Sequence, residues 1–111
     1  MEFIARYRFA GMSARKVRDV LDIIRGKHVE DAMQILRQTN KRASVMVDKT
    51  LRSAIANADD SLEADMDNLI VKKAVADEGP TRRRFRPRAR GRATVERRRS
   101  SHITIVVDDQ T

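Results

Sequence analysis

Hydrophobic residues recur along the chain at two spacings, and each spacing predicts one kind of secondary structure. Over residues 2–10, apolar and charged side chains alternate, with Phe3, Ala5, Tyr7 and Phe9 on one side. Alternation with period two and several aromatic rings is typical of a strand with one buried face. The pattern therefore predicts a strand over 2–10 whose aromatic side chains, Phe9 included, face the core.

Three amphipathic helices are expected next, because apolar residues then recur every three or four positions. The first is expected between Ser13, a suitable N-cap, and Gly26, a suitable C-terminal stop. A second is predicted over 29–38 and a third over 41–58, with Asn40 as its cap. Their inward-facing residues are predicted to be Val17, Val20, Leu21 and Ile24, then Ala32, Ile35 and Leu36, then Ala43, Val47, Leu51, Ala54, Ile55 and Ala58.

Two further segments, 69–77 and 102–107, are rich in Val and Ile and are predicted to be strands. The residues between them either form a long loop or continue the two strands outward as a ribbon that turns near residues 88–91. Pro87 has no amide donor, so irregular strand pairing is expected there.

The charge of the chain is concentrated in one segment. The formal net charge is +8, but residues 80–100 alone carry +9, from ten Arg, no Lys and Glu96. The remaining residues sum to −1, with +6 over residues 1–58, −5 over residues 59–79 and −2 over residues 101–111. We therefore expect a nearly neutral, polarised body that carries one strongly cationic segment.

Several classes of protein are disfavoured by composition. The chain has no cysteine, hence no disulfide framework and no thiolate site. No apolar run approaches the length of about 20 residues that spans a bilayer, and the first residues lack a signal-peptide pattern. We expect a soluble intracellular protein without membrane contact.

The arginine segment is the strongest functional signal. Guanidinium groups bind phosphate through two parallel hydrogen bonds and stack on bases, which Lys cannot do. A charge run that only improves solubility is the alternative, but it would not exclude Lys. Phe85 either stacks on a base or packs on the opposite arm. Glu96 is expected to pair with Arg82 or Arg83 across the ribbon.

A second basic surface is expected on the body, where Arg42, Lys49 and Arg52 share one helix face and Arg15, Lys16 and Arg18 lie on another helix. Such faces are often merely solvated, although their sign also suits nucleic acid.

No catalytic or metal site is expected. The five acids at residues 59–67 lack the Gly and the closing Glu of a calcium loop. His28 and His102 each stand alone, with no nucleophile or orienting group in their segments. We expect no enzyme activity, no metal and no cofactor.

Five motifs, in order, make the chain resemble the bacterial large-subunit ribosomal protein L-twenty-two family. They are Ser13-Ala14-Arg15-Lys16-Val17-Arg18, Ile24-Arg25-Gly26-Lys27, Ser53-Ala54-Ile55-Ala56-Asn57-Ala58, the segment from Asp77-Glu78-Gly79-Pro80-Thr81 to Arg92-Ala93, and Ser101-His102-Ile103-Thr104-Ile105-Val106-Val107. Departures from the family pattern stand at Arg82-Arg83 and at Val95-Glu96.

The resemblance implies an α+β fold, in which three helices pack on a small three-stranded antiparallel sheet and a long β-hairpin protrudes. Residues 1–79 and 101–111 would form a globular RNA-binding body, and residues 80–100 an extended hairpin. The implied role is structural, in the large ribosomal subunit of the cytoplasm. The protein would bind large-subunit (23S) rRNA and support assembly, and its hairpin would line the nascent-peptide exit tunnel.

The implied partners are that rRNA, neighbouring ribosomal proteins including L-four at the tunnel constriction, and the nascent peptide in transit; homo-oligomers are not expected. The rRNA-binding residues are predicted to be Arg15, Lys16, Arg18, Arg25, Lys27, Arg42, Lys49, Arg52, Asn57, Arg82, Arg83, Arg84, Phe85, Arg86, Arg88, Arg90, Arg92, Arg97, Arg98 and Arg99. The tunnel-lining tip is predicted to be Pro87, Arg88, Ala89, Arg90, Gly91 and Arg92. The alternative function is that of an architectural DNA-binding protein that inserts a basic ribbon into a groove.

Overall fold

The chain folds as an α+β protein, which confirms the expected class. The computed structural model describes residues 1–109, apart from the side chains of Arg88 and Arg92. Its elements, in chain order, are β1 (Glu2–Ala10), α1 (Ala14–Ile24), α2 (Val29–Gln38), α3 (Arg42–Asp60), a 3-10 turn (Met66–Asn68), β2 (Ile70–Glu78), β3 (Arg82–Arg88), a tight turn (Ala89–Gly91), β4 (Arg92–Arg98) and β5 (Ser101–Asp108).

The body contains a three-stranded antiparallel sheet in the order β1–β5–β2. The last strand, β5, is central because it pairs with β1 on one edge and with β2 on the other. It is also the most buried of the three, with five buried residues: Ser101, Ile103, Ile105, Val106 and Val107.

The core lies between one face of this sheet and the helices. The apolar stripes predicted for α1 and α3 are buried, and Leu21, Leu51 and Ile105 are fully covered. Burial of one such side chain contributes about 1.5–3 kcal/mol to folding. Ile35 and Ile55 are only partly buried at the edge of this core.

The alternation of inward and outward side chains along β1 is interrupted near its end, so the prediction that Phe9 faces the core is wrong. The register with β5 shifts between Tyr7 and Ala10. At this bulge Phe9 has a φ of +58° and its side chain is 65% exposed, while Ala10 takes the buried position. A bulge adds one residue to a strand and thereby reverses the faces of the residues beyond it.

The helix starts differ slightly from the expectation. Ser13 is the N-cap of α1, as predicted, but its side chain makes no capping hydrogen bond. The N-cap of α3 is Lys41 instead of Asn40, and it too lacks a side-chain cap. The buried stripe that begins at Ala43 determines where α3 starts, since no capping side chain does so.

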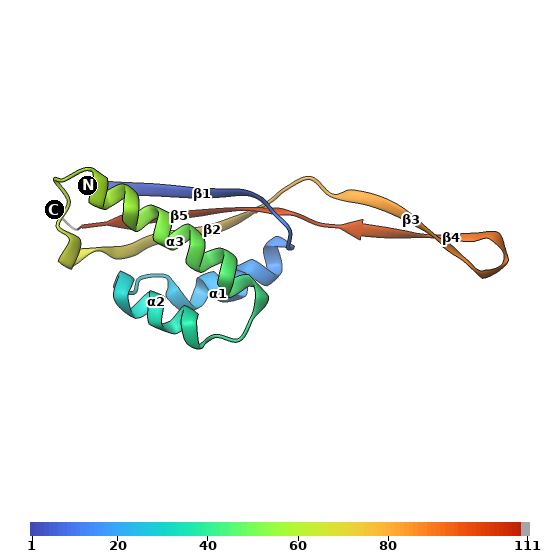
Figure 1. Cartoon of the computed structure of the whole chain (residues 1–111), viewed down its shortest axis with the longest axis horizontal. Coiled ribbons are helices and arrows are strands. Elements are labelled where there is room, and N and C mark those ends of the chain that lie inside the picture. The colour runs from blue at the N-terminus through green and yellow to red at the C-terminus, as the bar shows by residue number, and fades with distance from the viewer. Residues whose placement is uncertain (110–111) are drawn as a thin grey trace.

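Beyond the body, β3 and β4 form a separate two-stranded antiparallel sheet, which we call the ribbon together with the turn at Ala89–Gly91. Figure 1 shows the ribbon projecting from the end of the body opposite the two chain termini, and the molecule measures 64 × 25 × 17 Å. Pro87 lies opposite Ala93 without a register shift, so the irregular pairing expected there is wrong. Each ribbon strand has only one neighbour, and an edge strand accepts Pro where the amide would face outward.

Candidate nucleic-acid interface

The pairing register of the ribbon places arginines opposite arginines. Arg82 lies opposite Arg98, and Arg83 lies opposite Arg97. Like charges directly across a strand pair destabilise it. A ribbon with this register is therefore stabilised by anions around it.

Glu96 pairs with Arg86, so its expected pairing with Arg82 or Arg83 is wrong. The Arg86 Nε lies 3.0 Å from Glu96 Oε2. The register sets Glu96 opposite Arg84, and Arg86 lies two residues further along the same face of β3, so its guanidinium reaches Glu96 diagonally. Both side chains of the pair are partly exposed, and such a pair contributes about 0.2–1 kcal/mol.

Phe85 lies opposite Val95 on one face of the ribbon. The two side chains are 71% and 47% exposed, respectively. The opposite arm therefore does not cover the ring of Phe85, which remains open to an external partner.

The outer turn of the ribbon is narrow. Arg90 and Gly91 are both left-handed, with φ of +64° and +72°. Pro87 and Ala89 add little side-chain width. The side chains of Arg88 and Arg92, also assigned to this tip, lie outside the described part of the chain.

At the base of the ribbon the structure brings together cations from three distant segments. A groove with a cavity volume of about 830 Å³ is lined by Gly11, Met12, Ser13, Arg15, Lys16, Asp19, Arg42, Arg97, Arg98 and Arg99. Six of these ten residues are Lys or Arg, and Asp19 is the one acid among them. Figure 1 shows the first turns of α1 and α3 at the end of the body from which the ribbon leaves. We call this hollow the basal groove.

A second hollow of about 420 Å³ lies beside the basal groove and shares some of its walls. It is lined by Ser13, Ala14, Glu78, Gly79, Thr81, Arg83, Arg97, Arg99 and Ser100. The N-terminus of α1 opens toward both hollows, and its uncapped amide groups favour negative charge.

Other predicted contact residues are engaged within the protein. Both Nε and Nη2 of Arg18 donate to the carbonyl of Ala76, at 3.1 and 2.8 Å. Arg25 donates to the carbonyl of Ala74 at 2.6 Å and pairs with Asp22 at 2.7 Å. These two side chains join α1 to β2.

On α3, three of the predicted residues also have internal partners. The side-chain amide of Asn57 donates to the carbonyl of Ile4 at 2.9 Å. Arg52 pairs with Asp48 at 3.0 Å, and the Lys49 ammonium lies 5.7 Å from the centre of the Tyr7 ring. Lys27 is exposed, and its carbonyl accepts from the Val71 amide at 2.8 Å. Most of these partners lie on another element, so sequence periodicity contained no signal for them. Asp48 is the exception, because it lies four residues before Arg52 on α3 itself.

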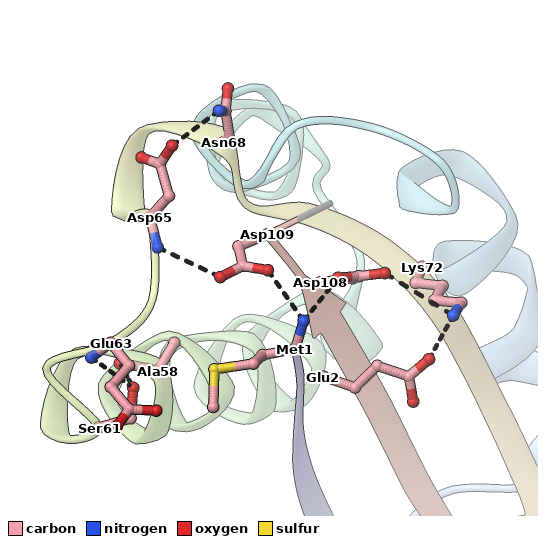
Figure 2. Close-up of polar contacts among 10 residues, drawn as sticks. All are labelled: Met1, Glu2, Ala58, Ser61, Glu63, Asp65, Asn68, Lys72, Asp108 and Asp109. Atoms are coloured by element: carbon pink, nitrogen blue, oxygen red, sulfur yellow. Dashed lines mark hydrogen bonds and ion pairs between the residues drawn. The ribbon is translucent and has the colours of Figure 1, made fainter. Parts of the chain in front are cut away.

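Residues 59–67, which we call the acidic segment, lie at the end of the body farthest from the ribbon, beside the termini (Figure 1). Asp109 is 1% exposed, and its carboxylate accepts from the Met1 amino group at 3.0 Å and from the Asp65 amide at 3.3 Å. Figure 2 shows this cluster and the neighbouring ion pair of Lys72 with Glu2. The hydrogen bond and charge of Glu2 raise the pKa of Lys72 above its ordinary value.

Within residues 1–109 no group of three or more His, Cys, Asp or Glu residues is placed to hold a metal ion. Over the same residues, no helix combines the length and the apolarity that crossing a membrane requires.

Comparison with known proteins gives one consistent family. Residues 5–108 match the model of the family described as ribosomal protein L22p/L17e. A protein of Thermoanaerobacter sp. (strain X514) is 58% identical over 110 residues, which is 99% of each chain. A protein of Pelotomaculum thermopropionicum is 53% identical over 99% of this chain and 97% of its own length. Both relatives are named "Large ribosomal subunit protein uL22".

Proposed function

The chain belongs to the ribosomal protein L22p/L17e family and is a structural, non-enzymatic protein of the large ribosomal subunit; on that premise we propose that it binds large-subunit (23S) rRNA through the ribbon and the basal groove. The observation that carries this proposal is the meeting of Arg97, Arg98 and Arg99 with Arg15, Lys16 and Arg42 around one open groove. Six cations facing a hollow with one acid form a site for a polyanion.

The distribution of charge indicates which end of the molecule faces RNA. The basal groove lies at the base of the ribbon, and the acidic segment, residues 59–67, lies at the end of the body opposite the ribbon (Figure 1). RNA therefore surrounds the ribbon and the adjacent end of the body, while the acidic end faces away from phosphate. Most of the affinity comes from neutralised phosphates, and specificity comes from a folded RNA whose shape accepts the ribbon.

The proposal extends to assembly and to the exit tunnel. A ribbon of mutually repelling arginines is ordered most strongly when RNA surrounds it, so its binding favours the folded RNA and supports assembly of the subunit. Its narrow turn, at Pro87, Ala89, Arg90 and Gly91 with Arg88 and Arg92 beside them, lies farthest from the body and lines the nascent-peptide tunnel. The tip there meets the nascent peptide in transit and protein L-four.

Binding of large-subunit rRNA and of duplex DNA of equal length, over a salt series, tests this function. We expect the wild-type protein to prefer the rRNA strongly and to lose affinity steeply as salt rises. The triple variant R15Q, K16Q and R42Q removes three charges from the basal groove. It should reduce the slope of log affinity against log salt by about two.

The control is the double variant R37Q and K73Q, which removes two exposed cations outside the basal groove. Its salt slope should stay close to that of the wild type. Equal affinity for duplex DNA and rRNA would contradict specific rRNA binding and favour architectural DNA binding.

A further inference from the structure

We propose that Phe9 and the guanidinium groups beside it form a binding site for one unpaired nucleotide of RNA, whose base stacks on the Phe9 ring and whose phosphate pairs with arginines. This inference rests on the proposed rRNA binding and adds a specific subsite to it. The site lies at the base of the ribbon, where β1 ends in its bulge.

The first observation is the conformation of Phe9. Its φ of +58° is left-handed, which is unfavourable for a bulky aromatic residue. The strained backbone directs a large apolar ring out of the core, and the ring is 65% exposed. Strain of this kind persists where the surrounding structure enforces it, and it occurs preferentially at binding sites.

The second observation is that the exposed ring is held in place. The rings of Phe9 and His102 meet edge to face, with centroids 4.9 Å apart and planes at 89°. The Phe9 amide donates to His102 Nδ1 at 3.0 Å, so the same imidazole positions both the backbone and the ring. Because His102 already holds the Phe9 ring in place, stacking of a ligand on this ring costs little additional conformational entropy.

The third observation is the hollow in front of the ring. A pocket of about 330 Å³ is lined by Phe9, Gly11, Pro80, Arg82, Arg98, Arg99 and Ser100. Pocket volumes for small ligands begin at about 300 Å³, which is the scale of a single nucleotide. The lining includes three arginines and no carboxylate.

Two of these arginines face each other across the ribbon, since Arg82 and Arg98 are register partners. Their repulsion is relieved when a phosphate lies between or beside them. An aromatic face next to paired guanidinium groups matches the two halves of a nucleotide, namely a flat base and an anionic phosphate.

This combination favours an unpaired base over the other anions that arginines attract. A base in a duplex is already stacked on its neighbours and presents no free face to Phe9. An acidic peptide would use the arginines alone and leave the ring without a partner. Bases of single-stranded RNA stack readily on aromatic side chains.

Fluorescence tests the contact directly, because the chain contains no Trp. The F9W variant places one indole in the site, and a base stacked on it quenches its emission. We expect oligoadenylate to quench this variant, and an abasic oligomer of the same length and polyglutamate to leave its emission unchanged. The L62W variant is the control: Leu62 is 92% exposed and lies in the acidic end of the body, so oligoadenylate should not quench it.

Affinity for large-subunit rRNA gives a second readout. F9L keeps an apolar side chain but removes the ring and should bind about tenfold more weakly, whereas F9Y should bind like the wild type. Circular dichroism of both variants should match that of the wild type, since the ring is exposed.

The outcomes separate this inference from the proposed function. Wild-type binding to rRNA with no loss in F9L and no quenching in F9W would overturn the nucleotide site alone. Equal quenching by polyglutamate would also overturn it and would point to an acidic peptide. Failure of the wild type to prefer rRNA over duplex DNA would overturn both.

Discussion

One buried carboxylate, that of Asp109, ties together three distant parts of the chain. It lies at the end of β5 and holds the Met1 amino group, which precedes β1, and the Asp65 amide, which precedes β2 (Figure 2). A buried carboxylate needs such partners, because an unpaired buried charge is strongly unfavourable. Asp109 therefore closes the end of the sheet that is farthest from the ribbon.

The Asp109 contact makes a prediction about pH. The hydrogen bond to Asp109 raises the pKa of the Met1 amino group above its ordinary value of 8.0, and the charges of Asp109 and Asp108 act in the same direction. The stability from this contact is fully present below about pH 8 and is lost as pH rises through the higher pKa of the folded state.

We therefore expect the thermal midpoint of the wild type to fall between neutral pH and about pH 10, and the fall to be smaller in D109N, which should also be less stable at neutral pH. Lys72 stays charged over this range, because Glu2 raises its pKa above 10.5. Thermal melts at several pH values measure both effects. Parallel pH profiles for the two proteins would show that Asp109 does not bind the amino group.

Gly79 is the second residue whose role depends on a close approach. Its amide donates to the Ser100 carbonyl at 2.9 Å, and a Cβ at this position would lie 2.6 Å from Ser100 Oγ and 3.3 Å from the Ser100 carbonyl carbon. The Ser100 hydroxyl in turn donates to the Pro80 carbonyl at 2.7 Å. A side chain at residue 79 must displace the Ser100 hydroxyl from its bond to Pro80 and crowd the Ser100 backbone.

We predict that G79A lowers the free energy of unfolding by about 1 kcal/mol or more, because it breaks the Ser100 hydrogen bond and crowds the backbone. G11A is the matched control, since nothing lies within 4 Å of a Cβ at Gly11, and it should change stability by less than about 0.5 kcal/mol. Urea unfolding of both variants tests this. Equal stability of G79A and G11A would contradict the account of the ribbon base.

At the scale of elements, α1 is attached to β2 by arginine side chains as well as by its apolar face. The fork of Arg18 on the Ala76 carbonyl and the bond of Arg25 to the Ala74 carbonyl lie about two helical turns apart along α1. Arg15, one turn before Arg18, points instead into the basal groove. Neighbouring arginines on one helix thus serve different purposes.

Substitution of these arginines by Lys should separate the two purposes. R18K loses the fork and should destabilise the protein by about 1 kcal/mol. R15K should leave stability within about 0.5 kcal/mol of the wild type and weaken rRNA binding instead. Unfolding and rRNA-binding measurements on both variants check the assignment. A destabilised R15K, or an R18K with wild-type stability, would reverse it.

The elements that sequence periodicity predicted are those with a continuous apolar stripe. The stripe Val17, Val20, Leu21 and Ile24 located α1, and β2 and β5 differ from their predicted bounds by one residue. Periodicity could not locate the partner of Glu96, since strand register depends on the turn at Ala89–Gly91 and not on local pattern. It also failed at Phe9, where one additional residue in a bulge reverses the faces of a strand.

The candidate site likewise has a part that the sequence predicts and a part that it does not. The ribbon arginines were evident from composition alone. The basal groove was not evident, because no sequence pattern relates α1, α3 and the end of β4. There the structure brings Arg15, Lys16 and Arg42 together with Arg97, Arg98 and Arg99. The internal contacts of Arg18, Arg25 and Asn57 depend on tertiary packing for the same reason.

At the scale of the whole molecule, the ribbon contributes nothing to the hydrophobic core. Among the described residues, every buried hydrophobic side chain lies before residue 77 or after residue 102. The chain segments at the ribbon base are already adjacent, since the Gly79 amide bonds to the Ser100 carbonyl. Closing a short loop there costs little conformational entropy.

We therefore predict that deletion of residues 82–99, with Thr81 joined to Ser100, leaves a body that unfolds cooperatively and binds rRNA far more weakly than the full chain. Calorimetry and rRNA binding of the deletion variant measure the two effects. An unfolded deletion variant would show that body and ribbon are not separable.

A single-particle structure of large ribosomal subunits that contain this chain tests the central claim most directly. The account predicts that rRNA encloses β3 and β4, that phosphates occupy the basal groove at Arg15, Arg42 and Arg97, that the turn at Ala89–Gly91 lines the nascent-peptide tunnel, and that Asp59 and Asp60 face away from RNA. A ribbon exposed on the outer surface of the subunit, with the acidic end of the body against rRNA, would contradict it.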